Sequence, residues 1–198
     1  MKIDNSLPLE YSTEENSLKI FGFWIFLGAE IMLFATLFAG YFVLQDRTAG
    51  GPGVEIFEIT PVLAETILLL TSSFVIGLGI HAMRLGRQKA MMTFFAITLL
   101  LGLGFLCVEI YEFMHYVHIG AGLQTSAFTA MLMTTLGTHG AHVTAGLFWG
   151  TFIILQVKKR GLTPATANKS FIFSLYWHFL DVVWIFIFSF IYLKGMIS

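Results

Sequence analysis

The sequence predicts an all-α integral membrane protein whose transmembrane helices form a single bundle. Hydrophobic residues make up 57% of the 198 residues, only 12% are charged, and the mean hydropathy is +0.80. Soluble domains of this size do not have such a composition. The apolar stretches also contain glycines, which membrane helices use to approach one another closely. No alternating strand pattern competes with this interpretation.

Apolar stretches that are long enough to cross a bilayer, about 20 residues each, define the elements in order. Five such helices are expected, at residues 20–44, 62–83, 90–111, 128–157 and 171–193. The first 19 residues are polar and form a separate cytoplasmic segment. They contain no apolar run, so we expect no cleaved secretory signal, and the first helix directs insertion. Residues 20–198 are expected to form one transmembrane domain.

Basic residues indicate the orientation of the bundle, because cytoplasmic connectors are enriched in lysine and arginine. They gather after the second and fourth predicted helices, at Arg84, Arg87, Lys89, Lys158, Lys159, Arg160 and Lys169. The connector at 45–61 has one basic residue against three acidic ones, and residues 119–126 carry no charge. We therefore expect the N-terminus to be cytoplasmic and the C-terminus to lie outside.

Several function classes are excluded by what the sequence lacks. The 11 basic and 12 acidic side chains balance, so no nucleic-acid partner is expected. A single cysteine, Cys107, cannot form an internal disulfide or a thiolate site for copper, zinc or covalent haem. Its place in an apolar helix predicts a small core residue. The serine-hydrolase Gly-x-Ser-x-Gly turn and the His-Glu-x-x-His zinc motif are also absent.

A layer of polar residues is expected near the middle of the membrane. With a rise of about 1.5 Å per residue, these side chains reach similar depths: Glu30, His139, His142, His178 and Asp181. His139 and His142 share a helix face, as do His178 and Asp181. Ionisable groups in a bilayer are costly without partners. Three interpretations remain open here: hydrogen bonds between helices, a di-histidine haem site, or a proton relay through Glu30.

A second polar group is predicted at the outer interface. Its members, three residues apart on one helix, are Glu109, Glu112, His115 and His118. The spacing is similar to the Glu-x-x-His pattern of di-iron proteins, but that chemistry needs further carboxylates from facing helices. Glu65 is the one candidate, and we expect it to be interfacial and solvated. Because steps of three rotate by about 60° each, the residues fan out. A hydrogen-bonded, partly hydrated helix end is favoured over a metal site.

Four motifs of this sequence together carry a family resemblance. Residues 174–186 (SLYWHFLDVVWIF) resemble the C-terminal helix signature of subunit III of haem-copper terminal oxidases. Residues 137–143 (GTHGAHV) are similar to its histidine-glycine-x-histidine segment, and 21–31 (FGFWIFLGAEI) to its helix with a mid-membrane glutamate. Residues 109–113 (EIYEF) add a fourth match in the same order. The resemblance covers nearly the whole sequence.

The resemblance implies an accessory subunit of a proton-pumping oxidase in the bacterial cell membrane, which reduces oxygen to water in aerobic respiration. Such a subunit holds no haem, copper or catalytic residue, and the metal centres belong to the catalytic subunit I. Subunit II and a small subunit IV are the other expected partners. Family members bind phospholipid in a cleft between helices and sustain proton uptake. Glu30 corresponds by motif to the carbodiimide-reactive membrane glutamate of the family.

One departure from the family pattern concerns length, since full-length members have seven helices and this sequence has room for five. The N-terminal pair is missing, so we expect a catalytic subunit that is extended by extra C-terminal helices. Residues 47–51, 115–118 and 158–164 are most similar to the short bacterial quinol-oxidase version. Subunit III of a cytochrome c oxidase is the alternative. A di-histidine haem protein and a small proton-conducting bundle are alternatives from other classes.

Overall fold

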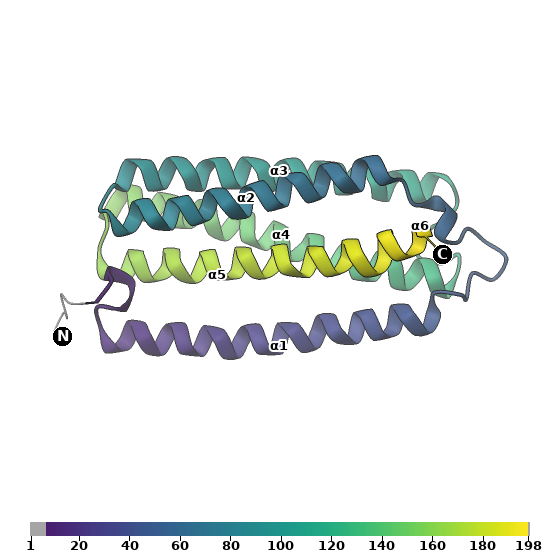
Figure 1. The fold of residues 1–198 in the computed structure, drawn as a ribbon, viewed down its shortest axis with the longest axis horizontal. Coiled ribbons are helices and arrows are strands. Elements are labelled where there is room, and N and C mark those ends of the chain that lie inside the picture. Colours follow the sequence, from purple (N-terminus) through teal and green to yellow (C-terminus); the bar gives the residue numbers. More distant parts are fainter. Residues whose placement is uncertain (1–6, 198) are drawn as a thin grey trace.

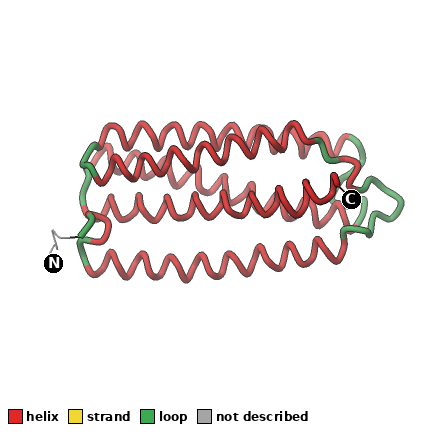
Figure 2. Tube along the Cα trace, viewed as in Figure 1, coloured by secondary structure: helices red, strands yellow, loops and turns green. Residues whose placement is uncertain are grey.

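The computed structural model describes residues 7–197 and is a bundle of long helices joined at its two ends by connectors, of which the one between the first two long helices is the longest (Figures 1 and 2). The long helices are α1 (Glu14–Leu44), α2 (Ile59–Arg84), α3 (Gln88–His118), α4 (Ala127–Arg160) and α5 (Pro164–Ile187). The π-helix η3 (Phe188–Leu193) and α6 (Lys194–Ile197) continue α5, while η1 (Leu9–Tyr11) and η2 (Val54–Ile56) are short 3₁₀ turns. Five helices are long and apolar enough to span a membrane, and residues 7–197 contain no strand. The predicted fold class is confirmed.

The helices extend beyond the apolar stretches because capping residues, and not the limits of hydrophobicity, fix their ends. Thr13 accepts a hydrogen bond from the backbone N–H of Asn16, so α1 begins at Glu14, inside the segment expected to be polar and separate. Ser126 and Thr129 form a capping box at the start of α4. At the start of α5, Thr163 caps the helix and Pro164 occupies its first turn.

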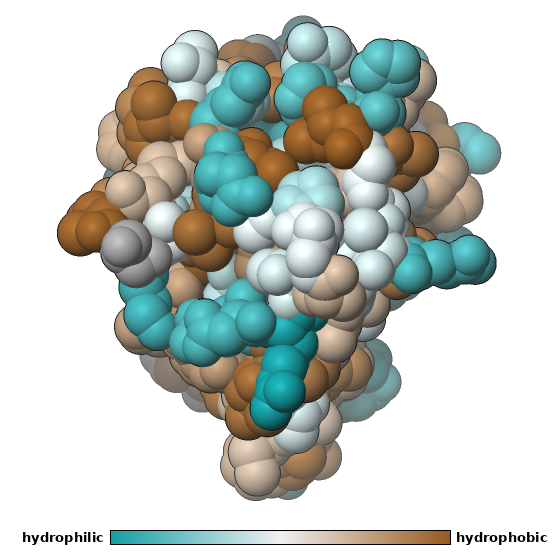
Figure 3. All heavy atoms as spheres, turned by 90° about the vertical axis from the view of Figure 1, so that its right-hand side faces the viewer, coloured by the Kyte–Doolittle hydropathy of each residue, from teal (hydrophilic) through white to brown (hydrophobic). Residues whose placement is uncertain are grey.

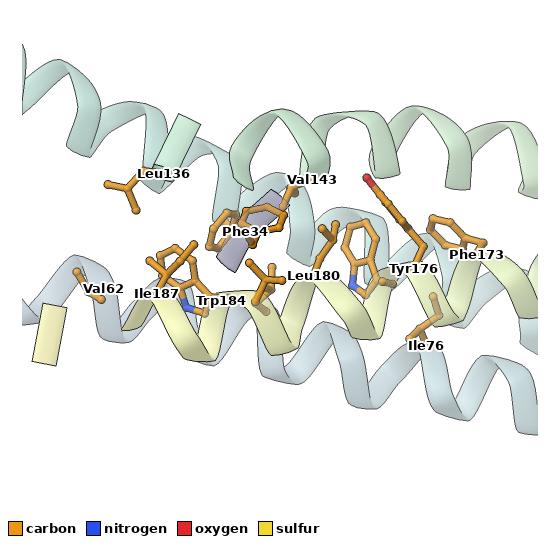
Figure 4. Close-up of a cluster of buried hydrophobic side chains, with 14 of the residues drawn as sticks. Phe34, Val62, Ile76, Leu136, Val143, Phe173, Tyr176, Leu180, Trp184 and Ile187 are labelled. Atoms are coloured by element: carbon orange, nitrogen blue, oxygen red, sulfur yellow. The ribbon is translucent and has the colours of Figure 1, made fainter. Parts of the chain in front are cut away.

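Helix α5 supplies the centre of the packed core. Its side chains at steps of four and three, Phe173, Trp177, Leu180, Trp184 and Ile187, are at most 1% exposed. This spacing places them along one stripe of the helix, and Figure 4 shows labelled members of the stripe between neighbouring helices. Helix α1 is the least covered element, since 17% of its membrane window is buried against 44% for α2. In Figure 1 it lies along one edge of the bundle.

The segment before α1 is held against the N-terminal end of the bundle. The Asn168 side-chain amide donates to the backbone carbonyl oxygens of Glu10 and Asn16, each at 3.0 Å. Arg84 pairs with the fully buried Glu10 at 2.8 Å, and Asn16 donates to the carbonyl oxygen of Pro164 at 3.1 Å. These contacts connect η1, α1, α2 and α5, so the N-terminal turn closes one end of the bundle.

The outward-facing surfaces are apolar along the helices and polar at the ends. Large hydrophobic side chains such as Trp24, Phe74 and Phe148 are more than half exposed, as expected for a surface in contact with lipid. Figure 3 looks onto the end near the C-terminus, where hydrophilic residues are spread among hydrophobic ones. Cys107 is exposed, so the prediction of a core cysteine was wrong. Two residues correspond to about 200° of helix, which turns Cys107 away from the buried face that includes Phe105 and Glu109.

Two glycines allow the helices to pack closely around the large rings of α5. A Cβ on Gly102 would lie 2.7 Å from Cη2 and Cζ2 of Trp177. A Cβ on Gly150 would lie 2.7 Å from Cζ of Phe173. Since aromatic rings are rigid, an added methyl group at either position forces the helices apart.

We predict that Gly102→Ala lowers the stability of the protein by about 1–3 kcal/mol, the usual cost of overpacking a core. Gly77→Ala is the matched control, because nothing lies within 4 Å of its added Cβ. The measurement is the thermal unfolding midpoint of the purified complex in detergent. A Gly102→Ala midpoint equal to that of the control would contradict the packing argument.

Candidate functional site

The predicted mid-membrane residues divide into three local groups, and the first joins α1 to α4. Glu30 Oε2 lies 3.1 Å from His142 Nε2, and the two side chains are 14% and 20% exposed. Glu30 is about 24 Å of helix from Glu14 and about 21 Å from Leu44, so the contact lies near mid-membrane. Phe34 packs against the imidazole, with ring centroids 5.4 Å apart.

This contact requires a shared proton. His142 Nδ1 lies 2.7 Å from the backbone carbonyl oxygen of Thr138, which can only accept, so Nδ1 carries a hydrogen. Nε2 then either accepts a proton from a neutral Glu30 carboxyl or, as part of an imidazolium, donates to the Glu30 carboxylate. In both cases one proton lies between the two groups. The Tyr176 hydroxyl donates to the carbonyl oxygen of His142 at 2.9 Å and fixes the local position of α4 relative to α5.

The second group is His139, which faces away from Glu30 and into the aromatic core. It is 0% exposed, and neither ring nitrogen has a hydrogen-bond partner. The rings of Phe105 and Trp184 lie at centroid distances of 5.6 and 5.5 Å, and that of Phe34 at 6.4 Å. These rings fill the space that a porphyrin would need beside the imidazole. His139 and His142 thus share a helix without forming a common site.

The third group connects α5 to α2 through a residue that the sequence did not identify. The Ser73 hydroxyl lies 2.7 Å from His178 Nδ1 and also hydrogen-bonds the Asp181 carboxyl. Serine has one hydroxyl hydrogen, so when it donates to Asp181, the Nδ1–H of His178 donates to Ser73 Oγ. Asp181 Oδ1 is buried without a hydrogen-bond partner. Ser73 therefore bridges His178 and Asp181, the two residues that share a face of α5.

The residues expected at the outer interface occupy two environments. Glu109 and Glu112 are each 4% exposed, whereas the His115 side chain is 39% exposed and His118 lies on the surface. His115 Nε2 is 3.9 Å from the exposed Glu58. The two glutamates are more deeply buried than a hydrated helix end would place them, because the turn that carries them faces α2, α4 and η3.

Three residues around these glutamates were missed or misplaced by sequence reasoning. Tyr116 donates to Glu112 Oε1 at 2.7 Å, and Tyr192 donates to Oε2 at 2.6 Å. Tyr116 follows Glu112 by four residues, a detectable helical spacing, but Tyr192 is distant in sequence and reaches the site from the π-helix η3. Glu65 was expected to be solvated and is 0% exposed, with neither carboxyl oxygen hydrogen-bonded.

These polar groups mostly connect helices. Trp177 and Trp184 donate their indole N–H groups to Ser72 and Thr66 at 2.9 and 3.0 Å, adding two more contacts between α5 and α2. Across residues 7–197, no group of three or more histidine, cysteine or acidic side chains is placed to hold a metal ion. The arrangement supports rigid packing and local proton sharing.

We predict that Ser73→Ala destabilises the bundle by about 0.6 kcal/mol, the average for hydrogen bonds between membrane helices, and by no more than about 1.7 kcal/mol, the largest value measured for one. The substitution removes the hydroxyl that holds both His178 and Asp181. Thr134→Ala is the control, since that exposed hydroxyl bonds only to the backbone of its own helix. Thermal unfolding and retention of the chain in the purified complex provide the readouts. Equal behaviour of the two variants would show that the Ser73 bridge contributes nothing measurable.

Comparisons of the sequence with known proteins show which family the chain belongs to. Residues 12–196 match the family model described as cytochrome c oxidase subunit III. The sequence is 58% identical over 195 residues to quinol oxidase subunit 3 of Bacillus subtilis (strain 168), covering 98% of this chain and 95% of that protein. It is 49% identical over 192 residues to cytochrome c oxidase subunit 3 of Bacillus sp. (strain PS3), covering 96% and 93%. The resemblance inferred from the four motifs is confirmed: the protein belongs to the cytochrome c oxidase subunit III family of haem-copper oxidases.

Proposed function

We propose that this protein is subunit III of a quinol-oxidising haem-copper oxidase that passes electrons to oxygen and pumps protons across the bacterial cell membrane. The observation that carries the proposal is the 58% identity to a quinol oxidase subunit 3, against 49% to a cytochrome c oxidase subunit 3 of similar coverage. The function as subunit III holds for either electron donor. Menaquinol or ubiquinol as the donor is the specific part of the proposal.

The chain contributes structural support to its neighbouring subunits and side chains that share protons. The contacts from α5 to α2 at Ser72, Ser73 and Thr66 make a stiff bundle that can support a neighbouring subunit in the membrane. The haems and copper belong to the catalytic subunit I. That subunit, together with subunit II and a small subunit IV, completes the assembly that we propose.

We assign the exposed side of helix α1 as the surface that contacts the extended catalytic subunit. This helix contacts only part of the bundle and has the lowest buried share of the five spanning helices. Full-length family members place two further helices on the N-terminal side of the one that α1 resembles. Extra C-terminal helices of the catalytic subunit would occupy that side here and cover exposed residues such as Trp24 and Met32.

A lipid site accompanies this interface. Phe23 and Phe26 of α1 face Ala145, Trp149 and Tyr176 across an open groove of about 390 Å³ with almost entirely apolar walls. The groove suits the acyl chain of a phospholipid. Tyr176 lines the groove, and its hydroxyl donates to the backbone carbonyl oxygen of His142. Tyr176 therefore connects the groove with the Glu30–His142 contact. We propose that bound lipid shields this proton-sharing contact.

We predict that the complex purified in mild detergent oxidises quinol and does not oxidise reduced cytochrome c. The partner chains are identified in the same preparation by mass spectrometry. A partner with a soluble domain that binds copper through two thiolates, together with cytochrome c oxidation, would assign the chain to the cytochrome c version instead.

For Glu30, we predict that Glu30→Ala leaves the haem content of the complex unchanged and shortens its active life during continuous turnover. Glu30→Gln should have the smaller effect, because its amide can still donate to His142 Nε2. Glu15→Gln is the control, since Glu15 is exposed and pairs only with Lys19. The measurement counts turnovers before half of the oxygen consumption is lost. Equal counts for Glu30→Ala and the control would remove Glu30 from the proposal.

A further inference from the structure

Three carboxyl groups meet inside the half of the bundle that lies towards the C-terminus. Glu65 comes from α2, and Glu109 and Glu112 come from α3. Their side chains are 0%, 4% and 4% exposed, and Glu65 is close enough to interact electrostatically with both other carboxyls. None of the ion pairs among residues 7–197 involves any of the three.

The hydrogen bonds distinguish the three groups. Glu112 accepts one hydroxyl donor on each oxygen, from Tyr116 and Tyr192, so of the three carboxyls it has the environment that most favours a carboxylate. Both oxygens of the fully buried Glu65 lack a hydrogen-bond partner, as does Oε1 of Glu109. Three adjacent negative charges without a cation are not tolerated in a protein interior. The charge can therefore reside on Glu112, while Glu65 and Glu109 hold protons.

One member of this cluster also lines a small cleft at the end of the bundle. The cleft is formed by Glu58, Pro61, Tyr111, Glu112, His115 and Tyr116, so Glu112 is the cluster residue that it includes. The partly exposed His115 and the exposed Glu58 lie at its mouth. On the deep side, Glu109 packs against the backbone of Gly140, where a Cβ would come within 2.9 Å of its carboxyl carbon. His139, whose ring nitrogens have no hydrogen-bond partner, immediately precedes Gly140 on α4.

We propose that Glu65, Glu109 and Glu112 form a proton-binding site that exchanges protons with water at the C-terminal end of the bundle. Glu112 carries the negative charge, and Glu65 and Glu109 are neutral acids. The titratable groups beside the cluster are Glu58 before α2, His115 and Tyr116 on α3, and Tyr192 on η3. On α4, Gly140 contacts Glu109, and the adjacent His139 points into the aromatic core. The site is separate from the Glu30–His142 contact and does not depend on the electron donor.

Infrared spectroscopy of the assembled oxidase complex tests this proposal, because the C=O stretch of a neutral carboxylic acid is resolved from the bands of a carboxylate. At neutral pH, the difference between wild type and Glu65→Gln, or between wild type and Glu109→Gln, should contain a lost neutral-acid band. Glu112→Gln should instead lose carboxylate absorbance. Glu58→Gln is the control for an exposed carboxylate. Loss of only carboxylate bands from Glu65→Gln and Glu109→Gln would overturn the proposal.

Two further measurements keep the test decisive. Glu65→Asp retains a carboxyl group and should shift the neutral-acid band without removing it. This variant replaces Glu65→Gln in the test if the Glu65→Gln complex fails to assemble. In deuterated buffer, the bands assigned to Glu65 and Glu109 should move to lower frequency as their protons exchange. Bands that keep their position in deuterated buffer would show a sealed acid cluster and overturn proton exchange with the C-terminal end.

Discussion

Side-chain hydrogen bonds between α5 and α2 are the constraint on which the rest of the structure depends. A bilayer gives little hydrophobic reward for bringing two helices together, so close packing and polar contacts must hold the pair. Trp177, His178 and Trp184 of α5 each reach a hydroxyl on α2. Their rings also fill the core, and Gly102 leaves room for the indole of Trp177. The same side chains therefore supply both the hydrogen bonds between the helices and the aromatic packing of the core.

This arrangement explains why α5 carries the clearest family signature without carrying a redox centre. The tryptophans are amphipathic, so one side chain can fill the core and satisfy a hydroxyl on the neighbouring helix. Histidine and aspartate are accommodated on this helix because Ser73 hydrogen-bonds to each of them. As a member of the subunit III family, the protein belongs to a terminal oxidase as an accessory membrane subunit. A rigid helix bundle suits an accessory subunit of this kind.

Two separate groups of side chains in the bundle hold protons. Glu30 and His142 share a proton between α1 and α4, on the side where the bundle is least covered. Glu65, Glu109 and Glu112 lie in a closed interior among α2, α3 and η3. The first contact is close to the groove that we assign to lipid, whereas Glu112 of the second group lines a cleft at the C-terminal end. A change at one should leave the other intact.

The sequence by itself determined the class, the number of membrane helices and the family, because spans of about 20 apolar residues and long ordered motifs are local patterns. It also placed Glu30 and His142 at a similar depth near the middle of the membrane. Only the tertiary structure decided their partners. Ser73 lies between His178 and Asp181, Tyr192 reaches Glu112 from η3, and Glu65 is fully buried. Depth along a helix follows from counting residues, but the direction in which a side chain points relative to other helices depends on how the helices pack.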